Sequence, residues 1–187
     1  LRQTVANYLS ALHPNPAAPI RADNIAITSA GVNALSLAAQ CIVNAGDRVV
    51  CVTPLWPNLV EIPKILSANV ECVALDFTAD GWQLDLDKLL AALTPETTML
   101  MVNSPNNPTG WTLSREEQKA ILARCREYGI WLLADDAYER LVFDGSGCAP
   151  SFFDVADAQD RLVSANTFSK SWLMTGWRLG WLVAPAP

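Results

Sequence analysis

Short apolar runs alternate with amphipathic stretches along most of the chain. Apolar runs rich in β-branched residues lie at residues 24–29, 47–53, 69–75, 97–103, 130–138, 161–168 and 178–184. The stretches between the first five runs carry apolar residues at helical spacing, at residues 31–43, 57–68, 84–93 and 114–129. Because apolar runs of this length that are bounded by Gly, Pro, Asn and Asp are typical of buried strands, the pattern predicts strands alternating with helices.

The helix expected at residues 114–129 has a start and a stop in its own sequence. Ser114 and Glu117 form the S-x-x-E pattern of a capping box, and Gly129 ends the helix next to Tyr128. Strands that alternate with helices are joined by right-handed crossovers and form a mostly parallel sheet that is covered on both faces. The predicted fold class is therefore α/β, a three-layer α/β/α sandwich with a mostly parallel sheet.

Composition favours one soluble domain over residues 1–187. Of the 187 residues 51% are hydrophobic and 17% are charged, which allows a substantial core. The net charge of −6 argues against a nucleic-acid-binding surface. The uncharged stretch at residues 24–46 holds several Asn, Ser and Thr residues, so a buried strand and helix explain it better than a membrane span.

The cysteines and the single histidine predict no metal site. The five cysteines form no C-x-x-C pair and lie mostly in apolar segments, which predicts reduced core thiols in a cytoplasmic protein. The histidine, His13, has no Cys or carboxylate at metal-ligand spacing, and we expect it at a helix end. A Ser–His–Asp site would need a second histidine.

Candidate binding residues cluster where the predicted strands end. In open α/β sheets, ligands bind beyond the carboxyl ends of the strands. The turn at residues 28–31 would leave the backbone N–H groups of Ala30, Gly31 and Val32 free for an anion, although an ordinary small-residue turn explains it as well. Trp56, between two prolines, suits the cover of a flat ligand and a core position equally.

Three further strand ends carry polar side chains. The loop at residues 103–110 has two prolines and presents the amides of Asn103, Asn106 and Asn107. Asp135 ends a buried strand, where a carboxylate is costly unless a cation or a hydrogen-bond donor meets it. Lys170 lies among hydroxyl residues, and two interpretations stay open: a charged loop that faces water, or an amine nucleophile beside an anion pocket.

Nucleotide-binding motifs are absent from the sequence. There is no G-x-x-x-x-G-K-[ST] pattern, and the segment GSGCAP at residues 145–150 lacks the third glycine of G-x-G-x-x-G. ATP and NAD are therefore disfavoured. A phosphorylated pyridine aldehyde, pyridoxal 5′-phosphate, would account for all five clusters of polar and aromatic residues.

Three motifs, in this order and at these separations, resemble those of the class I/II aminotransferase family of fold-type I pyridoxal phosphate enzymes. They are NSPNNPTG at residues 103–110, ADDAYERLVF at residues 134–143 and TFSKSWLMTGWRLGW at residues 167–181. The resemblance covers nearly the whole chain. It implies the large, cofactor-binding domain of such an enzyme.

The resemblance also implies roles for individual residues. Lys170 would form the internal aldimine, Asp135 would pair with the pyridine nitrogen, and Asn107 and Tyr138 would bond the phenolic oxygen. Trp56 corresponds to the aromatic residue that stacks on the ring. The phosphate cup would be formed by Arg178, Thr167, Ser169 and the turn at residues 30–32. The family pattern gives Asp136, which stands where glutamate is common, no role.

The function that the resemblance implies is transfer of an amino group from an amino acid to a 2-oxo acid. A β-lyase or a decarboxylase of the same fold stays an alternative, as does the aminotransferase-like effector domain of a transcription regulator. The resemblance further implies a homodimer. The family also carries an N-terminal segment and a C-terminal small domain that we do not find in these 187 residues, so we expect the chain by itself not to turn over substrate.

Overall fold

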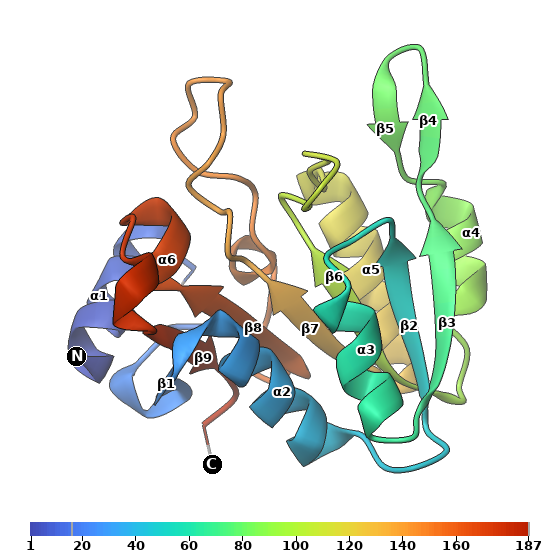
Figure 1. The fold of residues 1–187 in the computed structure, drawn as a ribbon, viewed down its shortest axis with the longest axis horizontal. Helices are drawn as coiled ribbons and strands as arrows, with labels where there is room; N and C mark the ends of the chain where they lie inside the picture. Colours follow the sequence, from blue (N-terminus) through green and yellow to red (C-terminus); the bar gives the residue numbers. More distant parts are fainter. Residues whose placement is uncertain (16, 187) are drawn as a thin grey trace.

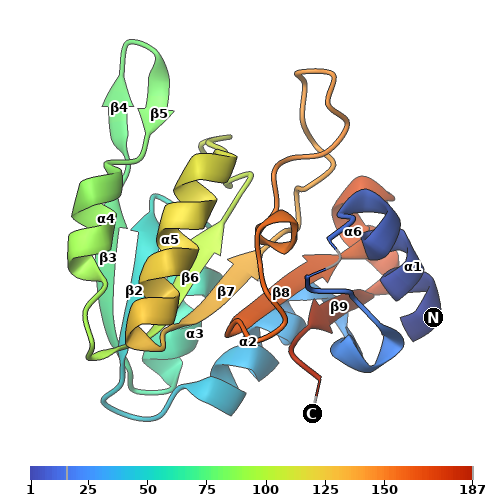
Figure 2. The same cartoon turned by 180° about the vertical axis from the view of Figure 1, so that it is seen from behind.

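A central sheet with the strand order β1-β9-β8-β7-β6-β2-β3 organises the computed structural model, which describes residues 1–15 and 17–186 (Figures 1 and 2). The helices are α1 (Arg2–Leu12), α2 (Ala30–Ile42), α3 (Asn58–Ile65), α4 (Leu86–Ala92), α5 (Arg115–Tyr128) and α6 (Phe168–Ser171). The strands are β1 (Ile25–Thr28), β2 (Arg48–Thr53), β3 (Asn69–Ala74), β4 (Asp76–Thr78), β5 (Gly81–Gln83), β6 (Thr97–Asn103), β7 (Trp131–Asp135), β8 (Leu162–Thr167) and β9 (Gly180–Val183). Single 3₁₀ turns are η1 (Ala22–Asn24), η2 (Phe152–Asp154) and η3 (Thr175–Trp177).

The sheet is mostly parallel, as the sequence predicts. Strands β3, β2, β6, β7 and β8 pair in parallel, and β9 runs antiparallel to both of its neighbours, β8 and β1. The carboxyl ends of the five parallel strands therefore lie along one edge of the sheet, which is the upper edge in Figure 1.

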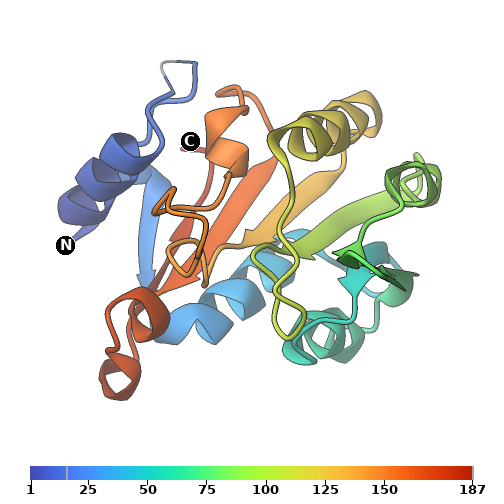
Figure 3. The same cartoon turned by 90° about the horizontal axis from the view of Figure 1, so that it is seen from above.

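Helices cover both faces of the sheet, so the predicted three-layer sandwich is confirmed (Figure 3). Side chains of β6 alternate between two hydrophobic clusters. Leu100 and Val102 join the cluster that includes residues of α1, α4 and α5, whereas Met99 and Met101 join the cluster that includes residues of α2 and α3. A strand that is buried on both faces has a continuous run of apolar residues, which is why β6 could be predicted from the sequence.

The ends of two helices lie where the sequence places them. The Ser114 side chain accepts a hydrogen bond from the Glu117 backbone N–H, and the Glu117 carboxylate accepts one from the Ser114 backbone N–H at 2.7 Å. Gly129 adopts φ 68°, the left-handed conformation that ends α5. His13 is the residue that follows α1, as expected.

Other features were not predicted. The hairpin of β4 and β5 projects beyond the sheet (Figure 1), and its strands of three residues are too short to show an alternating pattern. The expected core thiols are only partly found: Cys51 and Cys125 are buried, but Cys41 and Cys72 are exposed. No helix in the described part of the chain is long and apolar enough to cross a membrane.

Candidate functional site

A cavity of about 280 Å³ opens at the carboxyl edge of the sheet and brings all eleven predicted site residues together. They are Ala30, Gly31, Val32, Trp56, Asn107, Asp135, Tyr138, Thr167, Ser169, Lys170 and Arg178. The cavity is also lined by Asn103, one of the three candidate amides, and by residues without a predicted site role: Leu35, Asn58, Ala137 and Thr175. Asn103 lies in the loop at residues 103–110 and Asn58 lies two positions after Trp56, so polar side chains near the predicted strand ends were the available signal.

The end of β7 places two neighbouring carboxylates on opposite sides of the sheet. Asp135 lines the cavity and is 7% exposed, and its Oδ1 accepts a hydrogen bond from the Ala137 backbone N–H at 3.2 Å. Burial raises the pKa of Asp135 to about 6, although that hydrogen bond and the positive charge of Lys170 act in the other direction. Within residues 1–15 and 17–186, Asp135 forms no salt bridge, so its carboxylate can accept a cationic ligand.

Asp136 is buried away from the cavity. Its Oδ2 accepts a hydrogen bond from the Ser164 hydroxyl at 2.5 Å, and burial together with the nearby Glu139 raises its pKa to about 7. The sequence pattern gave this residue no role, and its position on the far side of the strand end explains why it does not line the cavity.

Asn107 and Tyr138 form a polar pair at the cavity wall. The Asn107 amide nitrogen lies 3.3 Å from the Tyr138 hydroxyl, and the Asn107 backbone N–H donates to Asn103 Oδ1 at 2.7 Å. Asn103 in turn donates to the Asp135 carbonyl at 3.0 Å, which ties the loop to the end of β7. Asn106, the third amide of this loop, does not line the cavity, because its Oδ1 accepts hydrogen bonds from Thr109 of its own loop.

The short helix α6 presents the amine and the hydroxyl groups. Thr167 precedes the helix and its Oγ1 accepts a hydrogen bond from the Ser169 backbone N–H at 3.1 Å. Lys170 follows within the same turn, and its Nζ lies 5.4 Å from the centroid of the Tyr138 ring. The Arg178 guanidinium donates to the Thr175 carbonyl at 3.1 Å, and in the described residues it forms no salt bridge, so its charge is free to meet an anion.

The start of α2 lies against β9 and forms the floor of this end of the cavity. A Cβ atom on Gly180 would lie 2.6 Å from the Ala30 carbonyl carbon and 2.7 Å from the Gly31 nitrogen, so only glycine fits there. Ala30 and Arg178 both adopt positive φ, 70° and 49°, and both line the cavity. Strained backbone is costly and tends to cluster at functional sites. Because the first N–H groups of a helix have no carbonyl within the helix to bond, the start of α2 suits an anion.

These features fit pyridoxal 5′-phosphate. At one end of the cavity is the buried Asp135 carboxylate and at the other is the Arg178 guanidinium, and neither forms a salt bridge within the described residues. Hydroxyl groups and the start of a helix lie at the same end as Arg178. An amine and a polar amide–phenol pair lie between the two ends. Trp56 packs against the α2–α3 cluster and also lines the cavity, so its position is compatible with both roles that the sequence left open.

Fold and cavity together define a fold-type I protein of the pyridoxal phosphate-dependent class. The chain matches the family model for aminotransferase class I and II over residues 1–187, and it belongs to this family. Pyridoxal 5′-phosphate is the cofactor of this family, so the predicted cofactor is confirmed.

Relatives and solved structures agree with this assignment. The chain is 31% identical over 167 residues to the arginine–pyruvate transaminase of Pseudomonas aeruginosa, covering 89% of this chain and 42% of that protein. It is 31% identical over 186 residues to the aspartate aminotransferase of Pyrococcus horikoshii, covering 100% of this chain and 46% of that protein. The crystal structure of aspartate aminotransferase from Thermotoga maritima superposes with a TM-score of 0.89 at 28% identity, over 98% of this chain and 47% of that one. The chain thus spans less than half the length of these relatives.

Proposed function

We propose that the chain is the cofactor-binding domain of an aminotransferase, which transfers an amino group from an amino acid to a 2-oxo acid. The observation that supports this proposal most is the convergence of Lys170, Asp135 and Arg178 on one cavity from separate strand ends, in a chain of the aminotransferase family. The names of the relatives include both an arginine–pyruvate and an aspartate enzyme, so we leave the amino acid open.

The cofactor, when bound, supplies an electron sink for the carbanion that forms at the substrate Cα. We assign Asp135 to hold a proton on the pyridine nitrogen, because a buried carboxylate that forms no salt bridge within the described residues stabilises a protonated base. Asn107 and Tyr138 bind the phenolic oxygen, and Trp56 stacks on the ring. Lys170 is the Schiff-base lysine, and its free amine then moves a proton at the substrate Cα.

We place phosphate binding at the end of the cavity opposite Asp135. We assign it to the guanidinium of Arg178, the hydroxyls of Thr167 and Ser169, and the N–H groups at residues 30–32. A guanidinium forms two parallel hydrogen bonds with a phosphate, which fixes orientation as well as affinity.

We further propose a cytoplasmic homodimer. Five free cysteines support a reducing compartment. Exposed apolar side chains in the segments that follow Tyr138 and Lys170 support association with a second copy; they are Leu141, Phe143, Trp172, Leu173 and Trp177.

Reduction of the bound cofactor with borohydride tests the assignment of Lys170. The chain has four lysines, and Lys119 on the exposed face of α5 provides a matched control. We expect borohydride to attach the cofactor to the tryptic peptide that contains Lys170. Lys170→Ala should abolish this label, and Lys119→Ala should retain it. A label on any other lysine contradicts the assignment.

Product analysis with the full-length gene product tests the reaction. An aminotransferase conserves the amino group, so 2-oxoglutarate should be converted to glutamate in step with the consumption of the amino acid. Release of ammonia would indicate a β-lyase, and release of carbon dioxide would indicate a decarboxylase. Either result would contradict amino-group transfer.

A further inference from the structure

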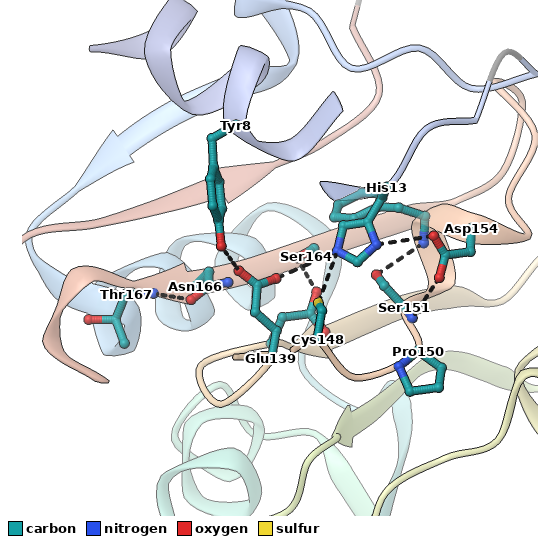
Figure 4. Close-up of polar contacts among 12 residues, drawn as sticks. Tyr8, His13, Glu139, Cys148, Pro150, Ser151, Asp154, Ser164, Asn166 and Thr167 are labelled. Carbon is teal, nitrogen blue, oxygen red and sulfur yellow. Dashed lines mark hydrogen bonds and ion pairs between the residues drawn. The ribbon is translucent and has the colours of Figure 1, made fainter. Parts of the chain in front are cut away.

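A buried polar cluster connects α1 to the segment that follows β7, outside the cofactor cavity (Figure 4). We call it the α1 cluster and define it as Tyr8, His13, Glu139, Cys148 and Asp154. Its two central side chains are almost completely buried: Glu139 is 3% exposed and His13 is 4% exposed. A buried ionised group is costly unless it is paired, so the cluster must balance its own charges.

Hydrogen bonds and ion pairs provide this balance. The Tyr8 hydroxyl donates to Glu139 Oε1 at 3.1 Å, and His13 Nε2 lies 3.8 Å from Glu139 Oε2. His13 Nδ1 lies 3.1 Å from Asp154 Oδ1, and Asp154 is also bonded by the Ser151 backbone N–H. Burial by itself would lower the pKa of His13, but its hydrogen bonds to Asp154, Cys148 and Glu139 outweigh burial and raise it to about 11. His13 is therefore a cation between two carboxylates.

Glu139 follows Tyr138 directly, and the two side chains have different surroundings. Tyr138 lines the cofactor cavity, whereas Glu139 points to α1 (Figure 4). The backbone here is also held: the Glu139 N–H donates to the Asp136 carbonyl at 3.0 Å, and the Glu139 carbonyl accepts from the Ala149 N–H at 2.7 Å. The Tyr138 hydroxyl itself has only the long hydrogen bond of 3.3 Å from Asn107 in the part of the chain that the structure describes.

We propose that Glu139, held by Tyr8 and His13, is a positioning residue that sets the orientation of Tyr138 in the cofactor cavity. The inference rests on the proposed function, because Tyr138 matters there as a ligand of the phenolic oxygen. Helix α1 contributes no residue to the cavity wall, but through its contact with Glu139 it helps to orient a residue that does.

Fluorine NMR of the cofactor-free protein provides the first test. The chain has three tyrosines, so labelling with 3-fluorotyrosine gives three resonances from the chain, and single Tyr→Phe variants assign them. Tyr8→Phe removes one hydroxyl from the α1 cluster, and Glu139→Gln removes the negative charge but keeps the shape. We expect both variants to shift or broaden the Tyr138 resonance.

A matched control separates positioning from loss of stability. Asp160 accepts two hydrogen bonds of 2.6 Å from Arg126 in another partly buried ion pair, remote from Tyr138. Asp160→Asn should lower the melting temperature without moving the Tyr138 resonance. Should Glu139→Gln and Tyr8→Phe likewise lower the melting temperature and leave that resonance in place, the cluster is only structural and the proposal is wrong.

The bound cofactor provides the second test. Loss of a well-placed Tyr138 hydroxyl should raise the pH midpoint of the cofactor's absorbance change by about 0.5–1 unit, the equivalent of one hydrogen bond. We expect this shift for Tyr8→Phe and Glu139→Gln, and no shift for Asp160→Asn. An unchanged midpoint in the first two variants overturns the proposal. A failure of the unmodified protein to bind the cofactor would instead contradict the proposed function, and the NMR result would still decide the positioning role.

Discussion

Substitution of Gly180 tests how the cavity floor is built. Gly180 pairs with Thr28 of β1 and with Thr167 of β8, and its Cα faces the start of α2. A Cβ at this position would lie 2.6–2.7 Å from three backbone atoms, of Ala30, Gly31 and Asn166. Because backbone atoms cannot rotate away as a side chain can, Gly180→Ala must displace either β9 or the start of α2.

The expected cost is that of overpacking, about 1–3 kcal/mol of unfolding free energy. For a domain of this size this corresponds to a fall of about 2–12 °C in the melting temperature. Displacing the N–H groups at residues 30–32 should also remove at least one charge-assisted hydrogen bond to the phosphate, so the dissociation constant of the cofactor should rise about 10- to 100-fold.

Gly176→Ala is the matched control, since a Cβ at Gly176 meets no atom within 4 Å. Its unfolding free energy should stay within about 0.5 kcal/mol of the unmodified protein. Thermal unfolding followed by circular dichroism, together with fluorescence titration of the cofactor, measures both quantities. If Gly180→Ala melts and binds as Gly176→Ala does, then α2 does not lie against β9 as described.

Three further predictions concern the charges of Asp135 and His13 and the activity of residues 1–187 by themselves. In the full-length enzyme, Asp135→Asn should raise the activation barrier for turnover by about 3–4 kcal/mol, and near-normal turnover would place the charged partner elsewhere. In the cofactor-free protein at pH 8 the same substitution should raise the melting temperature, because a carboxyl whose pKa is raised to about 6 costs stability as pH rises through about 4–6. His13→Asn should lower the unfolding free energy most near pH 6 and progressively less toward pH 10. The pKa of His13 is raised to about 11 in the folded protein, so its stabilisation is lost as pH rises above the unfolded pKa of about 6.5. Urea unfolding at several pH values measures this, and a loss of stability that does not vary with pH contradicts the ion pairs. Residues 1–187 by themselves should bind the cofactor weakly and show no steady turnover, since they span less than half the length of the relatives. Positioning of the substrate is worth about 7–11 kcal/mol of the activation barrier, so its loss should prevent turnover. Glutamate formation over many cycles would refute this.

The fold could be predicted from the sequence because its strands are buried on both faces. Strand β6 has no polar residue between Met99 and Val102, so its apolar run is continuous. The site could be predicted because parallel strands bring their carboxyl ends to one edge of the sheet, which is where Asp135, Asn107 and Lys170 meet.

The α1 cluster could not be predicted in the same way. His13 lies 141 positions from Asp154 and 135 positions from Cys148 in the sequence, and Tyr8 lies 131 positions from Glu139. No local spacing or periodicity connects residues at such separations, and only the packing of α1 against the segment after β7 reveals them. The same holds for Gly180, whose need for glycine comes from the approach of another element rather than from its own backbone conformation.

The segment after β7 divides its polar residues between two sites. Asp135 and Tyr138 line the cofactor cavity, while their sequence neighbours Asp136 and Glu139 are buried on the other side. The two sets have different partners: Glu139 is paired with His13 and bonded by Tyr8, and Asp136 is bonded by Ser164. Within the described residues, Asp135 forms no salt bridge and accepts its hydrogen bond from the Ala137 backbone N–H. A buried charge that is paired within the protein has its desolvation penalty offset, and one that lacks an ion pair favours a ligand of opposite charge. Binding of a protonated pyridine should therefore stabilise the protein chiefly through an ion pair with Asp135.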